Sequence, residues 1–273
     1  MYQISGGLTL TRHAACHYVQ KEVKIPAKYT RIGKEAFSRQ SQIHRVFLPP
    51  SLQRIDANAF RMCTSLKEIK LSCVRTLGNG VFQQCSSLRT AYMPVHLNMV
   101  SSSLFREDRS LKKVLFPKHS HLQHIGEHAF EDCQSLEQIH IPSEVQTIRA
   151  YAFSKCKMLN QVQFSENLIS IDTRAFYFCD LEHLELPDTL EYLGDSAFFK
   201  CNRLTTVRLP ASVRYIGKWI FHGCNRLQVL EIRHDPEFIG EWIINKAARI
   251  RCYRGSAVDR YCRSFNFNVE YID

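Results

Sequence analysis

Cysteine is the residue whose chemistry stands out first in this 273-residue chain. Eleven cysteines would be enough for several disulfides or for a zinc centre. Seven of them, however, share one place, three residues after a phenylalanine: Cys63, Cys85, Cys133, Cys156, Cys179, Cys201 and Cys224. Thiols that recur once per repeat form a line, and a line cannot converge on the tetrahedral point that zinc requires.

We therefore predict that the seven repeat cysteines are buried free thiols, since free cysteine is among the most buried residue types. Cysteines in adjacent repeats could still come within disulfide distance, so bridges along the line stay open. Cys16 and Cys262 lie outside the repeats, and we expect these two to be the most reactive thiols. So many unpaired thiols favour a reducing compartment over an oxidising one.

Histidine gives the second cluster with possible chemistry: His119, His121, His124 and His128. His124 and His128 would meet on a helix, but Ile125-Gly126 between them reads as a turn, so we interpret the stretch as an exposed polar loop. The sequence contains no G-x-S-x-G, H-E-x-x-H, P-loop, G-x-G-x-x-G or C-x-x-C motif. We expect no enzymatic activity, no metal and no cofactor.

The phenylalanines that precede the cysteines define the repeat that must position any site. They recur at intervals of 22 to 25 residues: Phe37, Phe60, Phe82, Phe105, Phe130, Phe153, Phe176, Phe198 and Phe221. Self-similarity at this period is typical of a solenoid, in which stacked coils bury a face that one coil cannot bury alone. The function should then be sought on the surface of the stack.

Two periodicities lie inside each repeat. From the alanine before the phenylalanine, apolar residues fall at i, i+1, i+4 and i+7, which predicts a short helical piece. A strictly alternating segment follows and predicts a three-residue strand, usually ended by proline, after which Ile-Gly turns the chain back. The predicted strand cores are Val23–Ile25, Val46–Leu48, Ile69–Leu71, Ala91–Met93, Val114–Phe116, Ile139–Ile141, Val162–Phe164, Leu184–Leu186, Val207–Leu209 and Leu230–Ile232. We expect these strands to form one long curved parallel sheet on the concave face, with short helices and turns outside.

The pattern A-F-x-x-C-x-x-L-x-x-I-x-I-P-x-x-V-x-x-I-G resembles the BspA-like (Treponema pallidum type) leucine-rich repeat family. The resemblance covers residues 22–248, in nine to ten repeats, and implies a right-handed coil. Residues 1–21 are then an N-terminal cap or lead-in strand, and 249–273 a C-terminal cap whose helix begins at Gly255-Ser256 and ends near Phe265. Local departures are Ser72 and Ser165 in place of proline, Asp108 in place of cysteine, and a repeat shortened by one residue at Asp180-Leu181.

Members of that family are largely cell-surface or secreted proteins implicated in adhesion and host contact. Residues 1–20 lack the basic start and apolar core of a secretory signal peptide, and no apolar run is long enough to span a membrane. We expect a cytoplasmic protein if the chain is complete, and a surface or secreted one if it is part of a longer family member.

Charge is unevenly distributed along the stack, with a formal total of +10. Residues 1–100 carry fourteen Lys and Arg against four acids, residues 101–200 ten against fifteen, and residues 201–273 twelve against seven. Such a field would steer an acidic partner to the N-terminal coils. An alternative function is therefore the binding of a polyanion, nucleic acid or acidic polysaccharide, by residues 1–100, although we consider nucleic acid the less suitable partner.

The candidate site lies on the concave face, where strand residues alternate with the buried ones. From Phe47 to Leu115 the central exposed column is apolar or aromatic in three of four successive coils, and basic residues flank it. This composition is typical of a protein-interaction hot spot. We predict that the partner is a protein with an acidic or amphipathic surface, bound by Arg45, Phe47, Lys70, Tyr92, Lys113 and Leu115, unless the N-terminal segment folds over them.

Overall fold

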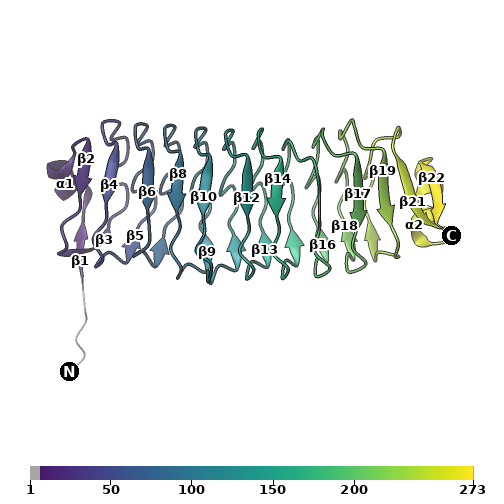
Figure 1. The fold of residues 1–273 in the computed structure, drawn as a ribbon, viewed down its shortest axis with the longest axis horizontal. Helices are drawn as coiled ribbons and strands as arrows, with labels where there is room; N and C mark the ends of the chain where they lie inside the picture. The colour runs from purple at the N-terminus through teal and green to yellow at the C-terminus, as the bar shows by residue number, and fades with distance from the viewer. Residues whose placement is uncertain (1–6, 273) are drawn as a thin grey trace, which may run out of the picture.

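The computed structural model describes residues 7–272, which form one elongated stack of coils with the two ends of the chain at opposite ends of its long axis (Figure 1). Coils succeed one another in sequence order, and neighbouring strands pair in parallel. The predicted solenoid of parallel strands is thus confirmed. Within residues 7–272, no helix has the length and apolar character needed to cross a membrane.

The first ladder of strands corresponds to the predicted sheet. It is a five-stranded sheet, a two-stranded sheet and a four-stranded sheet, one after another along the stack. Its strands are β2 (Glu22–Lys24), β4 (Arg45–Phe47), β6 (Glu68–Lys70), β8 (Thr90–Tyr92), β10 (Lys113–Leu115), β12 (Gln138–His140), β14 (Gln161–Gln163), β17 (Thr206–Leu209), β19 (Val229–Ile232), β21 (Arg249–Tyr253) and β22 (Asn268–Ile272). Most of them begin one residue before the predicted core, because the exposed residue ahead of the buried one also pairs.

One predicted strand is absent from the first ladder. Leu184–Leu186 is not a strand, and the ladder is interrupted between β14 and β17, in addition to the break between β10 and β12 that separates the five-stranded sheet from the two-stranded one. This coil contains the one-residue shortening at Asp180-Leu181, and its backbone still reaches the preceding coil through Glu182 N–H, which donates to Asn160 O at 3.2 Å. Losing one residue displaces the following segment from ladder register, so the strand pairing stops there.

A second parallel ladder, which the sequence analysis did not predict, runs along another side of the stack. It consists of β1 (Leu8–Leu10), β3 (Tyr29–Ile32), β5 (Arg54–Ile55), β7 (Thr76–Leu77), β9 (Met99–Val100), β11 (His124–Ile125), β13 (Thr147–Ile148), β15 (Ser170–Ile171), β16 (Tyr192–Leu193), β18 (Tyr215–Ile216) and β20 (Phe238–Ile239). The isoleucine of the Ile-Gly pair is therefore a strand residue. The glycine after it is required by close approach, because a Cβ at Gly126 would lie 2.4 Å from Val100 O.

The predicted short helices outside the sheet are turns instead. Each coil places two residues of this segment at positive φ, for example Tyr151 at 59° and Lys155 at 61°, and left-handed residues interrupt a right-handed helix. The turns bond from coil to coil: Phe153 N–H donates to Ala175 O of the next coil at 2.8 Å. Helices occur at the two ends of residues 7–272, as α1 (Arg12–Ala15) with the 3₁₀ turn η1 (Cys16–Tyr18), and as α2 (Ala257–Phe265).

The core is a column of phenylalanine rings with a column of thiols beside it. The nine repeat phenylalanines are fully buried, and successive ring centroids lie 5.1–5.7 Å apart. All seven repeat cysteines are buried as predicted, and each Sγ donates to the carbonyl of the phenylalanine one coil earlier, at 3.1–3.3 Å. Each thiol thus ties its own coil to the one before.

Two cysteines outside the repeats behave differently from each other. Cys16 is exposed, as expected, but the prediction that Cys262 is equally reactive is wrong, because this residue is fully buried. It lies on the inner face of α2, which closes the C-terminal end of the core. The Ser256 hydroxyl caps α2 by accepting from Asp259 N–H at 3.0 Å.

Candidate interaction surface

The six predicted site residues lie side by side on four adjacent strands of the first ladder. Strand pairing places Lys70 on β6 opposite Tyr92 on β8, and Tyr92 opposite Leu115 on β10. Arg45 and Phe47 both belong to β4, which pairs with β6, and Lys113 is on β10. The residues between them on each strand, such as Ile69 and Ala91, are buried, so the alternation holds the six side chains on the outer face.

Three of these six side chains are large apolar groups left open to solvent. Phe47 is 47% exposed, Tyr92 37% and Leu115 44%. The described part of the N-terminal segment does not cover them, because β1 pairs with β3 in the second ladder. Residues 1–6 lie outside the described part of the chain. The three groups therefore form an apolar stripe, Phe47, Tyr92 and Leu115, that the coils beneath hold in place.

Charged groups surround the apolar stripe. Lys70 Nζ lies 3.5 Å from Glu68 Oε1 and 5.4 Å from the centroid of the Tyr92 ring, a cation–π contact. Arg45 Nη1 lies 3.4 Å from Glu22 Oε1. The surface thus combines an aromatic group, Tyr92, with one cation, Lys70, that already lies over its ring.

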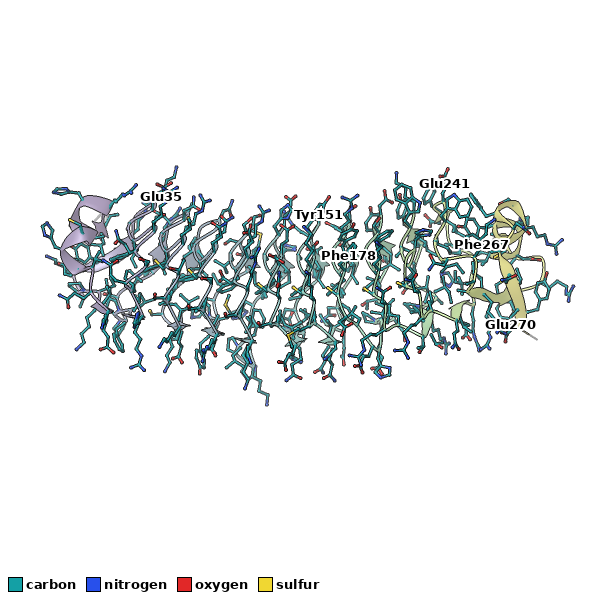
Figure 2. The ribbon with its side chains drawn as sticks, turned by 90° about the horizontal axis from the view of Figure 1, so that it is seen from above. Glu35, Tyr151, Phe178, Glu241, Phe267 and Glu270 are labelled. Carbon is teal, nitrogen blue, oxygen red and sulfur yellow. The ribbon has the colours of Figure 1, made fainter. Side chains whose placement is uncertain are left out.

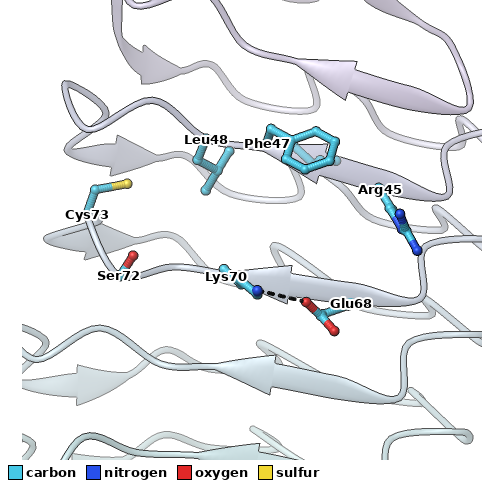
Figure 3. A pocket seen from close by; sticks show the side chains of 8 residues that line it. Arg45, Phe47, Leu48, Glu68, Lys70, Ser72 and Cys73 are labelled. Carbon is cyan, nitrogen blue, oxygen red and sulfur yellow. Dashed lines mark ion pairs between the residues drawn. The ribbon is translucent and has the colours of Figure 1, made fainter.

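A hollow of about 420 Å³ lies beside the stripe (Figure 3). Arg45, Phe47 and Lys70 of the predicted site line it, together with a second set of residues that the prediction missed: Leu48, Glu68, Ser72 and Cys73. Ser72 stands where most repeats have proline, and this departure is the one sequence signal that points to the hollow. Burial raises the pKa of the half-buried Cys73 thiol, which keeps it protonated at neutral pH.

The histidines of the sequence cluster do not converge. His124 Nδ1 lies 2.7 Å from Thr147 Oγ1, whereas His128 Nδ1 lies 2.9 Å from Glu131 Oε2. Across the described residues 7–272, no group of three or more His, Cys, Asp or Glu side chains is placed to hold a metal ion. His124 thus contacts the next coil, and His128 contacts a residue of its own coil.

An aromatic cluster on the turn side of the stack was also missed. Figure 2 labels two of its members, Tyr151 and Phe178. The Arg174 guanidinium lies 5.7 Å from the centroid of the Tyr151 ring and 5.5 Å from that of Tyr177, and the Tyr177 ring stacks on Phe199 at 5.2 Å. The signal was present in the sequence, because these residues occupy the positions two before and one or two after the repeat phenylalanine. Their rings contact one another, so little free aromatic face is left for a ligand.

A third aromatic group lies on the second ladder near the C-terminal end. The rings of Tyr192, Tyr215 and Phe238, on β16, β18 and β20, stack with centroids 4.8 and 4.6 Å apart. Tyr192 and Phe238 are 36% and 47% exposed, so this group also presents apolar surface to solvent. The stripe Phe47, Tyr92 and Leu115 differs from both clusters, since its members do not stack on each other and face solvent individually.

Comparison with known proteins agrees with the repeat pattern. The sequence matches the family described as the BspA type leucine rich repeat region over residues 13–136 and 123–251. No curated protein matches the sequence.

Several solved bacterial structures share the fold. A leucine rich cell surface protein from Faecalibacterium prausnitzii is 23% identical, with a TM-score of 0.54 over 92% of this chain and 79% of that one. A leucine-rich repeat protein from Bacteroides ovatus is 20% identical, with a TM-score of 0.53 over 97% and 88% of the two chains. The pneumococcal vaccine antigen PcpA is 15% identical, with a TM-score of 0.51 over 93% and 79%. At these identities the likeness establishes a common fold.

Proposed function

Because the chain belongs to the BspA-type leucine-rich repeat family, we propose that it is a non-catalytic module that binds a protein partner through the first ladder. The partner's contact surface is acidic or amphipathic. The apolar stripe Phe47, Tyr92 and Leu115 supplies the centre of the contact, and Arg45, Lys70 and Lys113 supply its rim. The observation that carries this proposal is the exposure of three large apolar side chains within four adjacent strands of a rigid sheet.

Rigidity supports the proposal on energetic grounds. The strands β4, β6 and β8 are bonded on both sides and β10 on one, and their central residues are buried, so docking would order little of the backbone. Loss of side-chain and loop freedom is a main cost of association, and a pre-ordered surface avoids part of it. Aromatic residues at the centre and cations at the rim match the usual composition of interaction hot spots.

The charges define what kind of partner fits. Lys113 makes no ion pair within residues 7–272. Lys70 pairs with the exposed carboxylate of Glu68, and Arg45 with that of Glu22. A partner with carboxylates around an apolar centre would form ion pairs with these three cations and at the same time bury the apolar stripe. The description of the Faecalibacterium protein as a cell surface protein agrees with extending the proposal to adhesion or host contact.

A peptide selection tests the proposal without a known partner. Peptides selected from a random display library against the intact chain should be enriched in Asp or Glu beside aromatic or aliphatic residues. Tyr92→Ala should weaken their binding by about 2 kcal/mol, roughly 30-fold, if Tyr92 is a hot spot. Lys70→Glu should mainly slow association, and more at low salt.

The matched control is Tyr253→Ala, which removes an equally exposed tyrosine from β21 in the C-terminal part. Its binding should equal that of the unmodified protein. Selected peptides that bind Tyr92→Ala and Phe47→Ala as tightly as the unmodified chain would show that the contact lies elsewhere.

A further inference from the structure

A second apolar surface, which the proposed function does not use, lies on the second ladder in four consecutive coils. It consists of Ile169, Tyr192, Tyr215 and Phe238, which together form an aromatic row. Strand pairing places the three rings opposite one another, and Tyr192 N–H donates to Ile169 O at 3.1 Å. Ile169 is 41% exposed, a fraction similar to those of Tyr192 and Phe238. The row therefore faces solvent along its length.

The stack of rings has an open end at Tyr192. Tyr215 covers one face of the Tyr192 ring, whereas the residue paired with Tyr192 on the other side is Ser170 of β15. Serine is too small to continue the stack, and no second ring of residues 7–272 stacks on Tyr192. Aromatic rings attract one another at centroid distances of about 4.5–7 Å, so an incoming ring fits beside Tyr192.

Acidic residues surround the aromatic row. The segments of the four coils that carry it contain eight acids against two Lys or Arg: residues 166–172, 188–195, 211–218 and 234–241. Both bases are already paired, Arg214 with Glu237 at 3.5 Å and Lys218 with Asp195 at 3.9 Å. The other six acids make no ion pair within the described part of the chain. A partner that fits this surface therefore carries cations around an apolar centre.

The apolar stripe of the first ladder has this composition. Its members Phe47, Tyr92 and Leu115 also fall within four consecutive coils, and its rim is basic. Stripe and row are both spaced by one coil, about 4.8 Å, so two stacks with aligned long axes keep them in register. Same-face side chains of an extended peptide repeat at about 6.6–6.8 Å and would fall out of step.

One chain cannot bring its own stripe and row together. The stripe lies on β4 to β10, towards the N-terminal end of the stack, and the rings of the row lie on β16, β18 and β20, towards the C-terminal end (Figure 1). The two surfaces also belong to different ladders. A contact between them therefore joins two molecules.

We propose that the aromatic row of one copy of this chain binds the apolar stripe of a second copy, with the two long axes aligned. This inference rests on the proposed function, because it names the partner of the stripe. The contact joins two different surfaces, so it is heterologous and leaves one stripe and one row free in every pair. Association of this kind extends beyond a dimer, into rings or open chains of copies.

Sedimentation velocity of the intact protein, from about 1 µM to about 1 mM, tests the proposal. The average size should grow with concentration and pass beyond a dimer. Tyr92→Ala and Tyr192→Ala should each weaken self-association by roughly 30-fold, the loss of one hot-spot side chain. Phe238→Ala tests the same row should Tyr192→Ala fail to fold. High salt should also weaken association, because the two rims carry opposite charges.

Mixing the two variants separates the proposed contact from nonspecific aggregation. Tyr92→Ala keeps an intact aromatic row and Tyr192→Ala an intact apolar stripe, so an equimolar mixture should regain the affinity of the unmodified chain. It should also stop at a dimer, because the two surfaces left free in the pair are both altered. The matched control Tyr253→Ala removes another exposed tyrosine and should associate like the unmodified chain.

Two results would overturn the proposal. A chain that stays monomeric at about 1 mM while selected peptides still bind its stripe would refute self-association and leave the proposed function intact. Association that is lost in Tyr192→Ala but unchanged in Tyr92→Ala would show that the row binds a surface other than the stripe.

Discussion

Phenylalanine fills one buried column of the stack in nine coils, whereas the exposed column over the first-ladder strands changes its character along the axis. That exposed column is largely apolar from Phe47 to Leu115 and becomes polar at His140, Gln163 and Glu185. Burial favours one residue type at a given place, because every coil offers the same close-packed space. Exposed positions carry no such constraint, so a run of similar exposed residues is informative about binding.

The cysteine column contains two departures from this uniformity, Gln40 in the coil of Phe37 and Asp108 in the coil of Phe105. Asp108 takes the place of the thiol and is fully buried. Its Oδ1 accepts from Cys85 N–H at 2.7 Å, but its Oδ2 has no partner within residues 7–272. Burial raises the pKa of this carboxyl well above its usual range.

The largest expected effect comes from breaking the buried phenylalanine column. Phe153→Ala should lower the free energy of unfolding by about 3–5 kcal/mol, since the ring is fully buried and stacks at 5.1 Å on both Phe130 and Phe176. Denaturant unfolding measures the change, with Tyr253→Ala as the exposed control. An unchanged midpoint for Phe153→Ala would contradict the uniform packing of the column.

A smaller effect of opposite sign should follow from restoring the cysteine column. Asp108→Cys should raise the free energy of unfolding at pH 7 by about 1–3 kcal/mol, because it removes a buried polar oxygen without a partner. The pKa of Asp108 is higher in the folded protein than in the unfolded chain, where it is about 4. The protonated carboxyl therefore contributes its full stability below about pH 4, and that contribution is lost as the pH rises through the folded-state pKa.

The stabilisation by Asp108→Cys should therefore be small near pH 4 and grow towards neutral pH. Unfolding curves at both pH values measure this growth, and Asp188→Asn, at an exposed site, should show none. The same gain at both pH values would mean that Asp108 ionises normally in the folded protein.

Thiol labelling compares the buried and exposed regions without any substitution. Cys16 should react at once in the native protein and half-buried Cys73 more slowly. The seven repeat cysteines and Cys262 should react only on unfolding, since burial blocks access and raises the pKa of Cys63, Cys224 and Cys262 to about 12. Mass spectrometry of digests identifies the labelled sites, and fast native labelling of Cys156 would reverse the assignment.

The smallest expected effect on stability is at the apolar stripe. Tyr92→Ala should leave the free energy of unfolding within about 0.5 kcal/mol of the unmodified protein, because its ring faces solvent. Thermal or denaturant unfolding is the measurement. A loss as large as that of Phe153→Ala would mean that Tyr92 is packed against further chain in solution.

Buried positions were predictable from the sequence because every coil offers them the same close-packed space and therefore repeats the same residue type. The spacing of the phenylalanines and cysteines identified the solenoid and placed Phe47, Tyr92 and Leu115 on adjacent strands. Two-residue strands such as Thr147–Ile148 give no alternation to detect, so the second ladder was not predictable. The left-handed turns were hidden as well, because residues as different as Tyr151 and Lys155 adopt them.

The hollow beside Phe47 shows what sequence periodicity leaves out of a candidate site. Its wall at Ser72 and Cys73 depends on how the chain leaves β6, which a pattern of apolar residues does not describe. Cys262 was likewise misjudged, because a position outside the repeat pattern is not thereby an exposed one. Its burial follows from the orientation of α2, whose apolar face turns to the core.

The coil without a first-ladder strand, at Leu184–Leu186, gives the molecule a mechanical asymmetry. The second ladder continues past it through β15, β16 and β18, and Phe176 N–H still donates to Ala197 O on the turn side. Under bending or tension the first ladder has two places at which to open, between β10 and β12 and at this coil, and at this coil it should open on this side only, as a one-sided hinge. The apolar stripe lies within the five-stranded sheet β2 to β10, on one side of both interruptions, and would move with that sheet.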